Sequence, residues 1–109
     1  MEGLSQILPL VESTKRPDGS FPLVQGLVFT MFDHRLELSR EVRDEVRRFF
    51  PQKAFKTTIP RDIAIAEASS HGQPIGEYDL RSRGSWAYMN LTKEILSHEY
   101  TESKAWARA

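Results

Sequence analysis

The run Gly26–Phe32, GLVFTMF, is almost wholly apolar and rich in β-branched and aromatic residues. Together with the preceding Leu23-Val24-Gln25, it is typical of a strand that is buried on both faces. Such strands lie inside parallel sheets that helices cover on both sides, with other strands next to them. The sequence therefore predicts an α/β fold in which this strand ends at Phe32, directly before Asp33-His34-Arg35.

Helical and strand patterns alternate along the rest of the chain. Apolar residues at helical spacing predict four helices, over residues 2–13, 39–50, 61–70 and 82–98. A second, short strand is expected over residues 54–59, ended by Pro60, and Ser39 is the expected N-cap of the second helix. Because helices separate the two strands, we expect the strands to be parallel and joined by a right-handed crossover.

The start of the last helix carries several residues with expected structural roles. Ser82 is the expected N-cap, and Gly84 would allow another part of the backbone to approach closely. Three large side chains, those of Trp86, Tyr88 and Met89, are expected to pack this helix onto the sheet.

Two parallel strands alone make a poor sheet, so the pattern predicts an incomplete domain. Lys plus Arg and Asp plus Glu both number 15, so net charge does not indicate a nucleic-acid or membrane partner. The absence of cysteine excludes disulfides, Cys-based zinc sites and Cys nucleophiles. Neither a signal peptide nor a membrane span is expected, because no long apolar run is present.

Three motifs, in order, resemble those of one family of ATPases. Residues 26–35 end in T-M-F-D-H-R, similar to the family pattern T-M-x-D-x-R. Residues 55–61 and 67–75 read F-K-T-T-I-P-R and E-A-S-S-H-G-Q-P-I, similar to K-T-x-I-P-R and E-A-P-S-x-G-K-P-I. Residues 78–84, Y-D-L-R-S-R-G, resemble Y-D-P-R-S-R-G. With these motifs, the chain is similar to the C-terminal part of ParA/Soj-type partition ATPases, within the ParA/MinD family of P-loop ATPases.

The resemblance implies a partial P-loop-type three-layer fold, with parallel strands and flanking helices, that comprises only the C-terminal half. Residues 1–98 would be the C-terminal portion of the ATPase domain, and residues 99–109 would be a tail. In the family, ATP and Mg²⁺ support a homodimer that coats DNA nonspecifically. A ParB-like centromere-binding protein stimulates hydrolysis.

The family's phosphate-binding loop lies in its N-terminal half, and no G-x-x-x-x-G-K-[ST] occurs here. Met1 falls in a region that is interior in the family. We therefore expect a fragment of a cytoplasmic, nucleoid-associated ATPase that serves chromosome or plasmid partitioning. The fragment alone is expected to be inactive and to bind no cofactor.

The candidate site lies after the C-terminal ends of the two strands, where open α/β sheets bind ligands. The resemblance implies that five residues lie beside the adenine base: Thr30, Met31, Asp33, Pro60 and Arg61. The alternative is that Asp33 and Arg61 cap strand ends or pair with each other.

Arg35 matches an arginine that contacts the DNA backbone in the family, although a solvated loop arginine is an equal alternative. A second such arginine is Ala64 here, and the lysine of the G-K-P loop is Gln73, which lowers the expected affinity for DNA. The arginines of helix 39–50 could compensate, or they could form a solvated face balanced by Glu41, Asp44 and Glu45.

No catalytic or metal-binding residue is expected. Ser69-Ser70-His71 lacks an orienting third group, and the three histidines lack metal-ligand spacing. Two alternative functions stay open. One is an interaction module that pairs with a full-length ParA-like protein through exposed strand edges. The other is a small DNA-binding protein that uses the basic helix 39–50, although the even charge balance argues against it.

Overall fold

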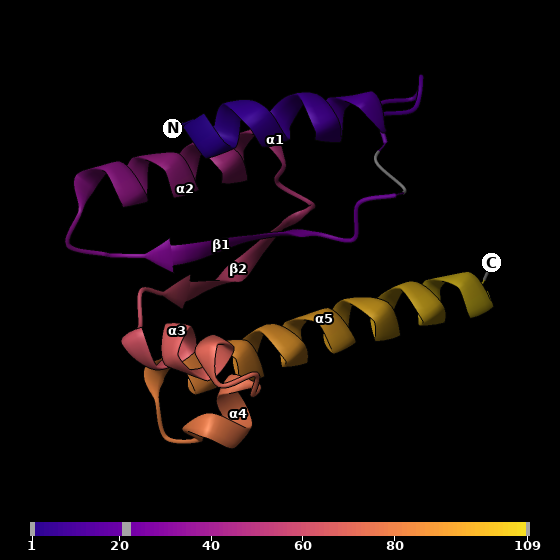
Figure 1. The fold of residues 1–109 in the computed structure, drawn as a ribbon. Helices are drawn as coiled ribbons and strands as arrows, with labels where there is room; N and C mark the ends of the chain where they lie inside the picture. The colour runs from indigo at the N-terminus through magenta and orange to yellow at the C-terminus, as the bar shows by residue number, and fades with distance from the viewer. Residues whose placement is uncertain (1, 21–22, 109) are drawn as a thin grey trace.

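The computed structural model describes the backbone of residues 2–20 and 23–108, and the side-chain surroundings of residues 6–20 and 23–98. Its elements are α1 (Glu2–Ser13), β1 (Leu27–Phe32), α2 (Glu37–Phe49), β2 (Ala54–Pro60), α3 (Ile63–Ser70), α4 (Ile75–Tyr78) and α5 (Arg83–Arg108). The elements form three layers, with α1 and α2 on one side of the strands and α3, α4 and α5 on the other (Figure 1). This arrangement confirms the predicted α/β fold.

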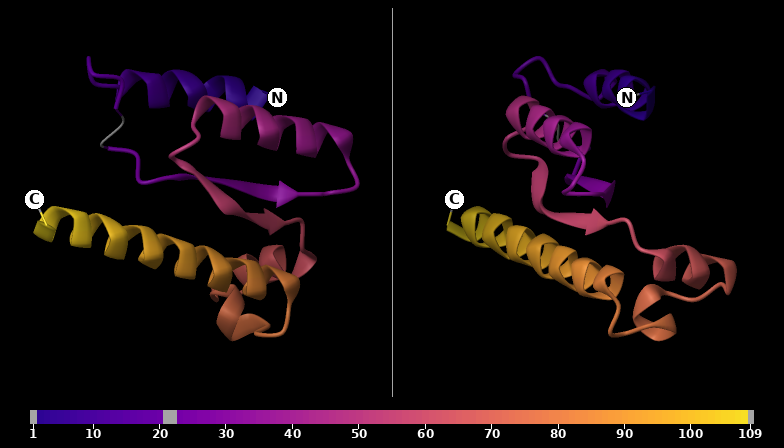
Figure 2. Two further views of the ribbon diagram at one scale, coloured as in Figure 1. Left: turned by 180° about the vertical axis from the view of Figure 1, so that it is seen from behind. Right: turned by 90° about the vertical axis from the view of Figure 1, so that its left-hand side faces the viewer.

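The two strands are parallel, as predicted. Leu27 pairs with Ala54, and Phe32 pairs with Pro60, with irregular register between these ends. The backbone N–H of Arg61 donates to the carbonyl of Phe32 at 3.2 Å, which carries the pairing one residue past β2. Both strands point toward the end of the molecule where α3 and α4 lie (Figure 2).

The prediction that the first strand is buried on both faces is wrong for this chain. Phe32 is the buried residue of β1, whereas Val28, Thr30 and Met31 are exposed. The reason is that, among the described residues, β1 has β2 as its one strand neighbour. The apolar sequence of β1 is therefore typical of a strand with more neighbouring strands and helices than the described part of the chain provides.

The core lies between β2 and α5. Phe55 and Ile59 of β2 pack with Ala87 and Leu91 of α5, and Ile65 and Ile95 join them at the edge. Small Ala87 lets the helix approach the strand closely, since packing fills space at near-crystalline density. Burial of these apolar side chains stabilises the packing of α5 on β2.

The expected packing of α5 through its large side chains is wrong. Trp86 is 61% exposed, Met89 is 46% exposed and Tyr88 is 37% exposed. Ser82 is confirmed as a cap, because its Oγ accepts the backbone N–H of Ser85 at 3.1 Å. The helix also continues to Arg108, past the predicted end at residue 98.

The helix starts show two further differences. Helix α2 begins at Glu37 after Leu36, which makes no side-chain cap, so Ser39 is not the N-cap. The turn that starts α2 is instead closed by the Leu36 N–H, which donates to the Asp33 carbonyl at 3.0 Å. Helix α3 begins after Asp62, whose side chain accepts the Ala64 N–H at 3.1 Å.

None of the described helices has the length and apolar character needed to cross a membrane.

Candidate functional site

The end of β1 carries a strained residue. Met31 has a φ of 54°, in the left-handed region that residues other than glycine rarely adopt. It lies in the irregular part of the register, between Phe29 and Phe32, where an irregularity can re-aim a side chain. Its side chain is 67% exposed, so the strained backbone conformation places an exposed thioether at the end of the strand.

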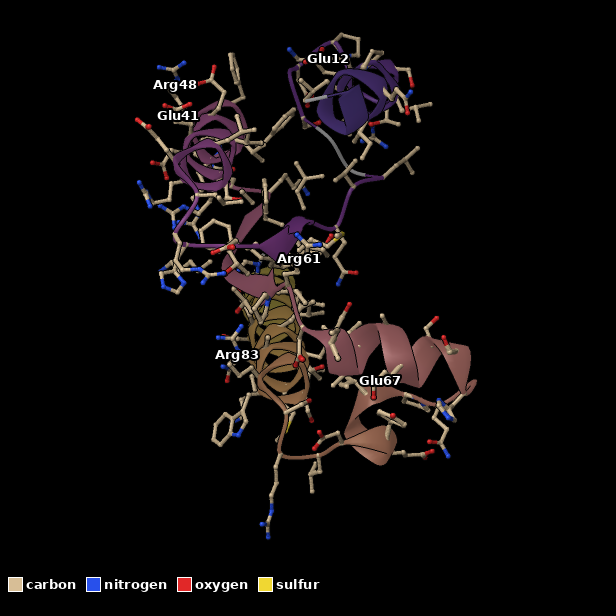
Figure 3. All side chains as sticks on the ribbon, turned by 60° about the vertical axis from the view of Figure 1, so that its left-hand side comes forward. Glu12, Glu41, Arg48, Arg61, Glu67 and Arg83 are labelled. Carbon is tan, nitrogen blue, oxygen red and sulfur yellow. The ribbon has the colours of Figure 1, made fainter. Side chains whose placement is uncertain are left out.

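Pro60 and Arg61 lie beside this strand end because Pro60 pairs with Phe32. The side chain of Arg61 is exposed. The backbone carbonyl of Arg61 accepts a weak hydrogen bond from the Arg83 guanidinium at 3.5 Å. Figure 3 shows Arg61 beside the strands and Arg83 at the start of α5. The first turn of α5 is thus brought to the same edge of the sheet.

Asp33 pairs with Arg35, and the alternative pairing of Asp33 with Arg61 is not formed. The Arg35 guanidinium donates to both Asp33 oxygens at 3.1 Å, and the Arg35 N–H donates to Oδ1 at 3.0 Å. These hydrogen bonds lower the pKa of Asp33 to about 2. The Arg35 side chain nevertheless remains 79% exposed, so its outer face is open to a second anion.

Thr30 and Met31 also line an apolar groove of about 560 Å³, which we call the α1–α2 groove. Its walls come from α1, β1, α2 and the start of β2, and its apolar members include Ile7, Val11, Val42, Val46 and Phe55. Asp33, Pro60 and Arg61 do not line it. The five predicted base-adjacent residues thus share one end of the sheet but divide between two surfaces.

The arginines of α2 are engaged within the chain. Arg48 donates to Glu45 at 2.9 Å, Arg43 to Asp44 at 3.0 Å, and Arg47 to the Lys56 carbonyl at 2.8 Å. Figure 3 shows Arg48 and Glu41 on the side of α2 that is turned away from the strands. This geometry favours the solvated, balanced face over a row of free cations.

Ser70 and His71 do not face each other. The Ser70 hydroxyl donates to the Ala66 carbonyl at 3.2 Å, and Nδ1 of His71 lies 2.8 Å from the Glu67 carbonyl. Within the described residues, no three histidine or carboxylate side chains gather where they could hold a metal ion.

Two carboxylates that sequence reasoning missed connect α5 to β2 and to the residue before α3. Glu94 of α5 accepts the backbone N–H groups of Lys56 and Thr57 at 2.7 and 2.9 Å. Asp62 accepts the Gly84 N–H at 2.8 Å with the oxygen that does not cap α3. Asp62 after Pro60-Arg61 carries an N-cap signal that sequence inspection could have found, whereas nothing in the spacing of Glu94 points to β2.

Comparison with known proteins gives curated relatives along most of the chain, although no family model matches it. The sporulation initiation inhibitor protein Soj of Bacillus subtilis is 41% identical over 98 residues, 90% of this chain and 39% of that protein. The chromosome partitioning protein ParA of Caulobacter vibrioides is 38% identical over 91% of this chain and 37% of its own length. The chromosome-partitioning ATPase Soj of Treponema pallidum is 36% identical over 91% and 39%, respectively.

The chain therefore spans less than two-fifths of the length of these three relatives. The resemblance predicted from the three motifs is confirmed.

Proposed function

This chain is homologous to the Soj and ParA chromosome-partitioning proteins over about nine-tenths of its length, and we propose that it forms the base-binding edge of a ParA/Soj-like ATPase. In this proposal the ATPase serves chromosome or plasmid partitioning, is cytoplasmic and associates with the nucleoid. The observation that carries the proposal is the 41% identity to Soj over 90% of the chain.

The strand ends are better suited to contact the adenine base of a nucleotide than to contact its phosphate groups. Met31 is exposed beside Pro60 and Arg61, and a thioether, a pyrrolidine ring and a guanidinium group can all lie against a flat aromatic ring. The sequence has no glycine-rich loop with lysine to hold phosphates. ATP, which supplies the phosphoryl group when bound, and Mg²⁺ would thus be held largely by residues outside this chain.

The first test is an ATPase and ATP-titration assay on the purified 109-residue chain. We expect no turnover, because positioning and charge neutralisation of the phosphates are most of phosphoryl-transfer catalysis. Turnover at the rate of a complete Soj protein would overturn the proposal that this chain supplies only the base-side edge.

The second test separates base contact from folding. In a hybrid Soj that carries residues 1–98 of this chain, Met31→Gly should weaken ATP binding about fivefold, the equivalent of one sulfur–aromatic contact. The thermal midpoint should not fall, because glycine adopts a φ of 54° without strain. Leu80→Ala, at a residue 63% exposed outside the candidate site, is the control and should change neither quantity.

Arg35 is our proposed contact to nonspecific DNA, and a ParB-like centromere-binding protein is the proposed partner of the complete homodimer. The support for the first is that Arg35 remains 79% exposed while paired with Asp33. In the same hybrid, Arg35→Ala should reduce the affinity for DNA. The slope of the logarithm of the binding constant against the logarithm of salt concentration should become shallower by about the value of one phosphate contact. An unchanged salt slope would remove Arg35 from the DNA surface.

A second candidate function is an interaction module that pairs with a full-length ParA-like protein. The observation that favours it is the α1–α2 groove next to the edge of β1 that has no strand neighbour among the described residues. Exposed apolar strand edges recruit partners. Co-sedimentation of this chain with complete Soj distinguishes the two functions, because a segment that works only in cis would not bind a complete homologue.

A further inference from the structure

The side of α5 that faces away from the strands carries exposed apolar residues. Its members are Trp86, Met89, Lys93 and Leu96, which we call the α5 outer strip. The three apolar members are 61%, 46% and 58% exposed, respectively. Leu91, which packs on β2, lies nearly half a turn around the helix from them. Helix α5 therefore has apolar side chains on two opposite faces, and of these two only the inner face is buried in the described structure.

The spacing of the outer strip is the spacing by which one helix packs along another. Its members are three, four and three residues apart, the alternation that keeps apolar residues on the seam between two helices. A helix that buries a single face carries polar residues on the opposite side. The outer strip departs from that rule with two aliphatic side chains and the large indole ring of Trp86, so this surface is stabilised by a second helix that covers it.

The residues along the strip do not provide charges that would select a charged partner. Asn90 and Ser97 flank it on one side and Thr92 on the other, and all three are uncharged. The Glu94 carboxylate is turned to β2, where it accepts two backbone N–H groups. Because like charges on facing flanks are what disfavour an identical partner, these flanks permit a second copy of the same helix.

Two identical strips fit each other when the helices run antiparallel. Trp86 of one copy then faces Leu96 of the second copy, and Met89 faces Lys93. The Lys93 stem can lie on the Met89 side chain while its ammonium group stays in water. A parallel arrangement would place Lys93 against its own counterpart. It would also bring together the two copies of α3 and α4, which lie at the start of α5 (Figure 1).

We propose that two copies of this chain pair through their α5 outer strips, as antiparallel helices. Each copy supplies a tryptophan at one end of the seam, and tryptophan is among the residues that contribute most binding energy in protein interfaces. The strip faces away from β2, whereas the α1–α2 groove lies on the other side of the strands. The pairing is therefore independent of the proposed base contact and of any partner at the edge of β1.

The test is sedimentation velocity of the full chain in a Val28→Lys background, which weakens association at the edge of β1. We expect a reversible dimer that forms as the protein concentration rises. The chain has two tryptophans, so Trp106→Phe is added to leave Trp86 as the single indole reporter. Its fluorescence emission should shift to shorter wavelength as the dimer forms, because the exposed ring loses its contact with water. A monomer at every concentration, or a dimer without this shift, would overturn the proposal.

Substitutions of exposed residues test the orientation of the two helices. Trp86→Glu should weaken dimerisation about thirtyfold or more, the loss typical of an aromatic anchor. Met89→Glu should change the dimerisation constant less than about threefold and make it depend on salt, because the new carboxylate faces Lys93 of the second copy. Equal losses from these two substitutions would contradict the antiparallel seam, and a dimer that tolerates Trp86→Glu would place the interface elsewhere.

The control for an added carboxylate is Ile63→Glu, on α3 and outside the strip. Ile63 is 76% exposed, so this substitution should leave dimerisation unchanged. The thermal midpoint of each variant is measured at a concentration where the chain is monomeric. It should stay that of the parent chain, because all three replaced side chains are exposed. A Trp86→Glu variant with a lowered midpoint would show that the indole ring serves the fold, and its assignment to the seam would be wrong.

Discussion

Gly84 is a residue at which the fold tolerates little change. Its N–H donates to Asp62 at 2.8 Å, and a Cβ at this position would lie 2.5 Å from Cγ1 of Ile65. Gly84→Ala should therefore lower the free energy of unfolding by roughly 1–3 kcal/mol, the cost of overpacking a filled site. This loss would exceed the gain of about 1 kcal/mol that alanine normally brings to a helix. Urea denaturation measures the difference.

Gly76 provides the matched control for that prediction. It is also helical, but an added Cβ would meet Ser85 Oγ at 4.0 Å, an ordinary contact. Gly76→Ala should leave the free energy of unfolding unchanged or raise it by up to about 1 kcal/mol, the gain that alanine brings to a helix. Equal effects of the two substitutions would mean that the close approach of α3 to α5 is not what requires glycine at residue 84.

At the scale of elements, Glu94 connects α5 to β2 where the register of β2 with β1 is irregular. Its two carboxylate oxygens accept the consecutive backbone N–H groups of Lys56 and Thr57. These groups would otherwise be open donors on an edge strand, which invite pairing with another chain. Burial raises the pKa of Glu94, but the hydrogen bonds from the two amides outweigh burial, and the pKa lies below its ordinary value of 4.5.

The sign of this shift fixes the pH dependence. Because the folded pKa of Glu94 is depressed, its contribution to stability is present above pH 4.5 and is lost as pH falls through the lowered value. Glu94→Gln should lower the free energy of unfolding at pH 7 by about 1–2 kcal/mol, since an amide can accept at only one of the two positions. The gap from the wild type should narrow in acid. Glu41→Gln removes one negative charge from an exposed position on α2. This control should change neither the free energy of unfolding at pH 7 nor its dependence on pH.

The elements could be predicted from the sequence better than their packing. Apolar periodicity located every helix and strand except four-residue α4, and the Ser82 cap and the close approach at Gly84 followed from local chemistry. Local chemistry cannot decide which face of α5 turns inward. Ala87 and Leu91 fit against β2 where Trp86 does not, because the separation between helix and strand selects the side chain. The irregular register around Met31 and the Glu94 contact with β2 are tertiary features that local chemistry does not encode.

At the scale of the whole molecule, the two sides of the sheet differ. On the α5 side, β2 is buried by a packed core and tied by Glu94. On the α1–α2 side, an apolar groove remains open above β1. This asymmetry explains how β1 can have the sequence of a central strand and still be largely exposed. Its sequence suits a sheet that extends past β1, in the direction away from β2.

That asymmetry predicts that the isolated chain associates through β1 and the α1–α2 groove. Sedimentation velocity at rising concentration should show reversible self-association, because exposed apolar strand edges pair with one another. Val28 lines the groove and is 36% exposed, so Val28→Lys should reduce association by about tenfold without unfolding the chain. Leu80→Lys, 63% exposed and outside the groove, is the control for added charge. A chain that stays monomeric at every concentration would contradict this prediction.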